Sequence, residues 1–133
     1  MSKQAFISIS YDKRSDFDDS INTLKSVLQE FDITPYIFVD NYYFDGDERN
    51  MMESSKIAIN ESDFVIAEVS HKAIGIGVEV GYAIGIGKPV IYIRHDSAEH
   101  SKTIAGMANH QIIYIMQEDL HHELYSVLQI LLN

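Results

Sequence analysis

The segment from Asp63 to Ile93 constrains the fold more than any other part of the sequence. It begins with the continuous apolar run 64–67 and ends with a second one, 89–93, and both have the length and β-branched content of buried strands. Glycines recur at every fourth position between them, at Gly77, Gly81 and Gly85. On a helix this spacing forms one smooth stripe that suits close packing on a sheet. The segment therefore predicts a right-handed strand–helix–strand unit with parallel strands.

Composition and charge narrow the class of protein. With 133 residues, 46% of them hydrophobic, one domain spanning residues 1–133 with its own core is expected. No apolar run reaches the roughly 20 residues of a membrane-spanning helix, and no signal-peptide pattern is expected at the N-terminus. The absence of cysteine fits a cytoplasmic protein. The net charge of −10, without a basic face, argues against a nucleic-acid partner and favours small molecules or proteins.

The remaining sequence alternates short strands with helices. Further strands are predicted at 5–10, 34–39 and 111–115. Helices are predicted from a cap at Ser15 or Asp16 to about Phe31, from a cap at Asp47 to about Asn60, briefly at 103–107, and over 120–131. Five strands alternating with helices indicate an α/β fold, a flavodoxin-like (Rossmann-like) three-layer sandwich with a five-stranded parallel sheet.

A ligand site is expected where the strand order reverses. In open parallel sheets, ligands bind beyond the carboxyl ends of the strands at that point. With the order 2-1-3-4-5, the point lies between the first and third strands, so the segments 8–14 and 69–79 converge on it. The polar residues that these segments bring to one crevice are Ser8, Ser10, Tyr11, Asp12 and Glu79.

Glu79 is the first candidate for chemistry. It lies in an apolar setting about two residues into the predicted helix, where the helix N-terminus offsets part of the desolvation of a carboxylate. Gly75 and Gly77 allow the backbone to approach a ligand closely. The glycine spacing, and Arg94 where an acid is expected at the end of the next strand, argue against a dinucleotide fingerprint. The alternative for Glu79 is a glutamate that favours the helix dipole and faces water.

These motifs resemble the nucleoside 2-deoxyribosyltransferase family and its relatives, the deoxynucleoside-monophosphate N-glycosidases. The resemblance rests on FISIS at 6–10, ESDFVIAEVS at 61–70, and the pattern G-x-G-x-E-x-G-x-A followed by G-K-P-V at 75–90. It implies a nucleoside or nucleotide substrate, no cofactor, and Glu79 as the nucleophile that attacks C1′ and expels the base. The covalent glycosyl-enzyme then passes its sugar to another base or to water.

The sequence departs from this family at several positions. Ser55 stands where the family often has an aspartate, and it remains a candidate for substrate binding. Phe6, in contrast, agrees with the family, which has tyrosine or phenylalanine at this position. Ala73 and Ala105 fall where the monophosphate hydrolases have phosphate-binding serines, which counts against a 5′-phosphate substrate.

Aromatic and acidic side chains follow the second predicted strand. Asp40, at the carboxyl end of that strand, is a candidate for contact with the sugar or the base. The loop that follows holds Tyr42, Tyr43 and Phe44, whose rings either stack on a base or pack over the sheet edge. Arg14 is read as a solvated charge.

The segment before the last strand completes the set of candidates. Met107 and Asn109 lie where the resemblance implies residues that complete the pocket, sometimes across a dimer interface; the alternative is an ordinary turn. A homodimer is expected because Ile104 and Met107 offer apolar surface beyond the needs of one core. No metal site is expected, since His121 and His122 are helix neighbours that do not share a face.

Two alternative functions remain open. The segment 6–17, FISISYDKRSDF, resembles the opening of Toll/interleukin-receptor-like domains, which cleave nicotinamide from NAD and also carry a catalytic glutamate at a helix start. A non-catalytic nucleotide-sensing or protein-interaction domain would have kept the pocket and lost the helper acid at Ser55.

Overall fold

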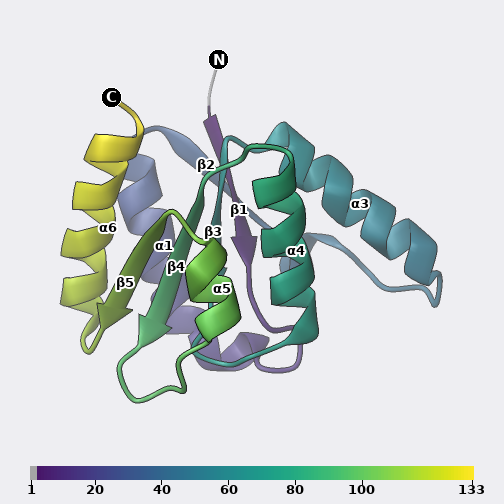
Figure 1. Cartoon of the computed structure of the whole chain (residues 1–133), viewed down its shortest axis with the longest axis horizontal. Coiled ribbons are helices and arrows are strands. Elements are labelled where there is room, and N and C mark those ends of the chain that lie inside the picture. The colour runs from purple at the N-terminus through teal and green to yellow at the C-terminus, as the bar shows by residue number, and fades with distance from the viewer. Residues whose placement is uncertain (1–2) are drawn as a thin grey trace.

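The computed structural model describes residues 3–133 and contains one parallel five-stranded sheet (Figure 1). Its order is β2-β1-β3-β4-β5, so the predicted strand order and the three-layer α/β fold are confirmed. The strands are β1 (Lys3–Ser8), β2 (Ile33–Ile37), β3 (Phe64–Glu68), β4 (Val90–His95) and β5 (His110–Tyr114).

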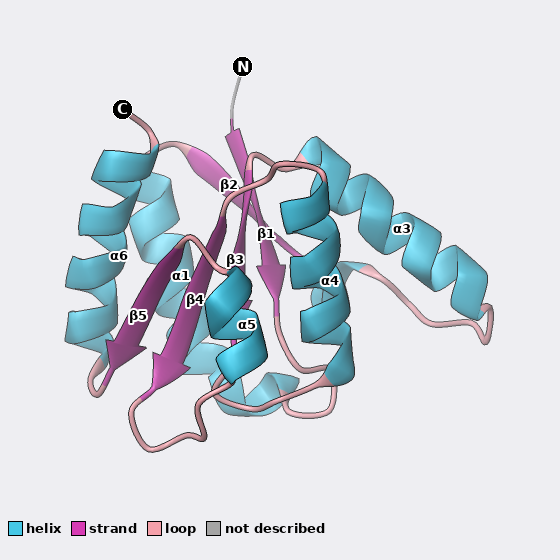
Figure 2. Cartoon of the chain, in the orientation of Figure 1, coloured by secondary structure: helices cyan, strands magenta, loops and turns pink. Residues whose placement is uncertain are grey.

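Helices cover both faces of the sheet (Figure 2). One face is covered by α1 (Asp18–Glu30) and α6 (Gln117–Leu131), and the other by α3 (Glu48–Glu61), α4 (Ile74–Gly85) and α5 (Lys102–Met107). Two short turns complete the chain, a 3₁₀ turn η1 (Arg14–Phe17) and α2 (Phe38–Asn41). In residues 3–133 no helix is long and apolar enough to cross a membrane.

Alternation along the strands divides the core between these two faces, because successive side chains of a strand point in opposite directions. The α1/α6 side buries Ile7, Ile66, Ile91, Leu24 and Leu124. The α3/α4 side buries Phe6, Val65, Tyr92, Ile59 and Val80. Ile104 belongs to this second core with 7% of its surface exposed, so the expectation that it is surplus to the core was wrong.

The helix caps were predicted with mixed success. The Asp47 cap is confirmed, since its Oδ1 accepts a hydrogen bond of 3.0 Å from the backbone N–H of Asn50. The predicted cap at Ser15 or Asp16 was wrong. Both residues lie inside η1, and α1 begins after Phe17 without a side-chain cap.

The chain turns earlier than predicted after the second strand. β2 ends at Ile37, and the following residues form α2 in place of a continued strand. Phe38 packs its ring 6.2 Å from that of Phe6 and 5.1 Å from that of Tyr42, which favours the turn. Asn41 Nδ2 donates to the Ile37 carbonyl at 2.7 Å and secures it. Asp40 is therefore helical, and the prediction that it leaves a strand end was wrong.

The glycine stripe of α4 does not pack on the sheet, contrary to prediction. The buried residues of α4 are Ile76, Val80 and Ala83. A Cβ built on any of the stripe glycines would meet no atom within 4 Å. The helix also begins at Ile74, so Glu79 lies in the second turn and not in the first. The N-terminal dipole therefore contributes less to Glu79 than predicted.

A buried polar network lies on the face of the sheet that α1 and α6 cover. Glu68, at the end of β3, is fully buried and accepts hydrogen bonds from Tyr114 Oη (2.8 Å) and the Ser70 N–H (2.7 Å). The Tyr114 hydroxyl also shares a hydrogen bond of 2.9 Å with Ser20 Oγ on α1. Burial raises the pKa of Glu68, and its hydrogen bonds oppose that shift. Burial, followed by the charge of Glu68, raises the pKa of Tyr114 to about 12.

Tyr114→Phe is expected to destabilise the fold by about 1–3 kcal/mol at pH values above the raised pKa of Glu68, where the ionised carboxylate loses a buried donor. The loss should shrink as the pH falls through the raised pKa of Glu68, since the neutral acid depends less on that donor. Urea unfolding at several pH values measures both effects. Tyr43→Phe is the control because Tyr43 is 88% exposed. Equal stability of the two variants would contradict the assigned role of the network.

Candidate active site

A cleft of about 410 Å³ lies at the predicted position, where the segments that follow β1 and β3 converge. The residues after β1 form one side, and the start of α4 forms another. The third side comes from α2, the loop after it, and the first turns of α3. The lining residues are Ile7, Ile9, Ser10, Tyr11, Asp12, Phe38, Val39, Tyr42, Phe44, Glu48, Met51, Met52, Ala73, Gly75, Ile76 and Glu79.

Glu79 is held by two buried hydroxyl groups. Ser8 Oγ, at the end of β1, donates to Oε1 at 2.5 Å, and Ser55 Oγ, on α3, donates to Oε2 at 3.1 Å. Both serines are 1% exposed. Three elements therefore meet at one carboxylate, and each of its oxygens keeps a lone pair that does not face a serine.

Burial raises the pKa of Glu79 above its ordinary value of 4.5, and the hydrogen bonds from Ser8 and Ser55 act in the opposite direction. The lining residues include no lysine, arginine or histidine that would stabilise the anion. Once ionised, Glu79 is a partly buried carboxylate with no counter-charge among the residues that line the cleft. Such a group is a reactive nucleophile or base.

The residues predicted around the crevice fall into two groups. Ser10, Tyr11, Asp12 and Gly75 line the cleft. Ser8 and Ser55 contact Glu79 itself. Gly77 lies on α4 between the lining residues Ile76 and Glu79, but it is half-buried and outside that lining itself.

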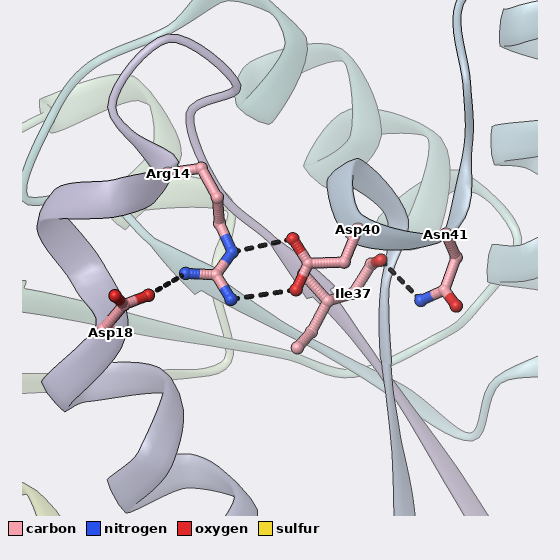
Figure 3. Close-up of polar contacts among 5 residues, drawn as sticks. All are labelled: Arg14, Asp18, Ile37, Asp40 and Asn41. Atoms are coloured by element: carbon pink, nitrogen blue, oxygen red, sulfur yellow. Dashed lines mark hydrogen bonds and ion pairs between the residues drawn. The ribbon is translucent and has the colours of Figure 1, made fainter.

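Asp40 is turned toward a different partner. Its carboxylate accepts two hydrogen bonds from Arg14, from Nε and Nη2, each 2.8 Å long (Figure 3). Arg14 Nη1 donates to Asp18 at 2.8 Å. Arg14 is thus not the solvated charge that the sequence indicated, and Asp40 is not among the cleft-lining residues.

Met107 and Asn109 also lie outside the cleft lining of their own chain. Asn109 Oδ1 accepts a hydrogen bond of 2.8 Å from the Val90 N–H and so fixes the start of β4. Met107, at the end of α5, is 46% exposed. A role for either in a pocket requires a second copy of the chain and stays a prediction.

The sequence did not single out most of the apolar wall as ligand-binding. Met51, Met52 and Glu48 lie on the first turns of α3, a helix that the sequence predicted without assigning these residues to a ligand site. Of the aromatic residues after β2, Tyr42 and Phe44 line the cleft, whereas Tyr43 is exposed outside it. An aromatic and methionine wall facing a carboxylate suits a ligand with a flat, apolar part and a polar reacting centre.

The fold and cleft together define a flavodoxin-like α/β protein with a desolvated glutamate at its topological switch point. The model of the family described as nucleoside 2-deoxyribosyltransferase matches residues 12–123. The chain therefore belongs to this family, as the sequence motifs indicated.

The chain is also similar to individual proteins, to one over part of its sequence and to others in fold. The chain is 35% identical over 71 residues to the putative 2′-deoxynucleoside 5′-phosphate N-hydrolase 1 of Syntrophotalea carbinolica. The match spans 53% of the chain and 49% of that relative, about half its length. In fold, the chain is similar to the CMP N-glycosidase BcmB of Clostridium botulinum, with a TM-score of 0.71, 22% identity, and coverage of 94% and 99% of the two chains. The fold is also similar to that of a 2-deoxyribosyltransferase from Leishmania mexicana, with a TM-score of 0.57 and 20% identity. That match covers 77% of this chain and 76% of the other.

Replacing either serine beside Glu79 should raise the pKa of Glu79 further. Each hydroxyl stabilises the anion. Ser8→Ala should have a larger effect than Ser55→Ala, because the hydrogen bond from Ser8 is 2.5 Å long and that from Ser55 is 3.1 Å long. An NMR titration of the Glu79 side-chain carboxyl carbon measures the pKa directly. Ser54→Ala, one residue away on the same helix, is the control. A Glu79 pKa that is unchanged in both variants would show that the hydroxyls do not stabilise its charge.

Proposed function

We propose that the chain cleaves or transfers at the N-glycosidic bond of nucleosides or nucleotides, with Glu79 as the nucleophile. Membership of the family supports this class of reaction. The proposal rests on the position of the Glu79 carboxylate, which accepts hydrogen bonds from Ser8 and Ser55 and lies beside a cleft lined by aromatic side chains. An acid with only a structural role would not need an open cleft in front of it.

The reaction proceeds in two displacements. An oxygen of ionised Glu79 forms a bond to C1′ while the bond from C1′ to the base nitrogen breaks, and the base leaves with the electron pair and gains a proton from solvent. The sugar is then held as an ester of Glu79. Water or a second base attacks C1′, loses a proton, and regenerates the carboxylate. Ser8 and Ser55 orient the carboxylate, and the wall that includes Phe38 and Tyr42 receives the base.

The charges of the cleft favour a substrate without a 5′-phosphate. The ionisable groups in the lining are all acidic or phenolic, with carboxylates from Asp12, Glu48 and Glu79. A phosphate in this space would be repelled by these carboxylates. Ala73, where the resemblance implies a phosphate-binding serine in the monophosphate hydrolases, lines the same cleft and offers no hydroxyl. Among its relatives, two are named as acting on phosphorylated substrates, so this chain is proposed to differ from them.

Incubation with 2′-deoxynucleosides, their 5′-monophosphates, ribonucleosides and NAD, followed by chromatography for released base, tests the proposed function. Deoxynucleosides should react fastest, because a 2′-hydroxyl withdraws electrons from the oxocarbenium-like transition state. Added free base separates transfer from hydrolysis. Nicotinamide release from NAD alone would favour the Toll/interleukin-receptor-like alternative. A chain that binds nucleosides and releases no base would be the non-catalytic alternative.

Glu79→Gln should lower base release by roughly a thousandfold or more, because the amide keeps the shape but cannot attack carbon. At pH 7 its melting temperature should equal or exceed that of the wild type. The raised pKa means that Glu79 stabilises the wild-type fold fully below 4.5 and that this stabilisation is lost as the pH rises through the raised pKa.

Glu53→Gln is the matched control, since Glu53 is exposed on α3 and pairs with Lys56 outside the cleft. Base release and the melting curve are measured on the same samples. Wild-type release from a normally folded Glu79→Gln variant would exclude Glu79 as the nucleophile.

A homodimer forms a second part of the proposal. The outward face of α4 exposes Ile74 (89%) and Val78 (48%), and the nearby α5 exposes Met107. The open glycines of α4 would let a second helix approach closely. Light scattering at micromolar concentration should give twice the chain mass of 15.1 kDa, and Val78→Glu should give the monomer. A wild-type monomer would count against the dimer.

A further inference from the structure

Arg14 ties together two segments that are distant in the sequence. Its guanidinium forms a two-pronged contact with Asp40 on α2, through Nε and Nη2, and a third bond to Asp18 at the start of α1 (Figure 3). A planar guanidinium matches a carboxylate in this geometry and fixes orientation as well as distance. The tie therefore sets how η1 and α2 lie relative to each other.

Both tied segments contribute walls of the cleft. Tyr11 and Asp12 lie just before Arg14, and Phe38, Val39 and Tyr42 surround Asp40 in the chain. Arg14 also shares a shallower hollow with Tyr11, Asp12 and Val39 at the side of the cleft. The distance between the wall after β1 and the wall of α2 is thus spanned by the Arg14–Asp40 pair.

The exposure of the two carboxylates shows which of the two ion pairs of Arg14 holds the segments together. The side chains of Arg14 and Asp40 are 23% and 36% exposed, whereas Asp18 is 71% exposed. Exposed ion pairs contribute little, and partly buried bidentate pairs contribute more. The arm to Asp40 is therefore the structural tie, and the arm to Asp18 serves as an internal comparison.

We propose that Arg14 and Asp40 form a positioning pair that sets the width of the cleft and so governs substrate affinity. The pair acts on binding and leaves the chemical step alone, because Glu79 is held by Ser8 and Ser55, which belong to β1 and α3. This inference rests on the proposed function, and it gives Asp40 the role of holding α2 in place rather than of contacting the substrate.

The test is a double-mutant cycle on the full chain with Arg14→Ala, Asp40→Ala and both together. Each single variant should raise KM for the best deoxynucleoside about tenfold with kcat within about twofold, and the double variant should be no worse than either single. Arg14→Lys should fail to restore KM, because an ammonium cannot make the bidentate contact. Asp18→Asn, which leaves the Asp40 contact in place, should keep KM within about twofold. Additive effects, or a loss in kcat alone, would overturn the proposal.

Hydrogen exchange without substrate separates this inference from the proposed function. In Arg14→Ala, the amides of residues 11–13 and 38–42 should exchange faster than in the wild type, and those of β3 should not. Unchanged exchange in both wall segments overturns the positioning pair even where base release is normal. If these amides exchange faster in Arg14→Ala but the wild-type protein releases no base, the positioning pair is retained and the proposed function is rejected.

Discussion

The Glu79 carboxylate is the constraint on which the arrangement of this molecule depends. Its burial is unfavourable, and the hydroxyls of Ser8 and Ser55 offset only part of that, so its pKa stays raised. Each hydroxyl comes from a different element, and those elements are brought together by the strand order with β1 beside β3. Moving α3 or α4 by one residue along its axis would separate the three groups. The topology thus fixes the site to a precision that the helix N-terminus alone would not give.

A comparison of Glu79 with Glu68 shows why a raised pKa does not by itself mark a reactive group. Burial raises the pKa of both glutamates. Glu68 lies on the α1/α6 side, has its oxygens occupied by Tyr114 and Ser70, and is not among the residues that line the cleft. Glu79 faces a space that a ligand can enter. The chemical difference lies in access, since structural networks perturb a pKa as strongly as active sites do.

The sequence was informative where the determining contacts are local or periodic. The apolar runs predicted the strands. Asp47 predicted the start of its helix because a capping side chain accepts a hydrogen bond from the backbone only three residues further along the chain. The turn of α2 was missed because it is favoured by the contact of Phe38 with Phe6, which no local pattern records. Arg14 and Asp40 are 26 positions apart, so neither their pairing nor its effect on the cleft was visible. The glycine pattern located the helix of Glu79 and misidentified its buried face, since small residues suit an open surface as well as a packed one.

Ser55 affects the chemistry of the site because it places no second carboxylate beside Glu79. An aspartate at this position would place a second carboxylate against Glu79, and the two would titrate as a coupled pair with one proton held strongly. A serine keeps the hydrogen bond to Oε2 and leaves Glu79 as a single titrating group. It also removes an acid that could protonate the departing base at this point. In the proposed reaction, that proton then comes from water entering the cleft. Bases that leave readily as anions or protonate easily are therefore the ones this site is suited to release.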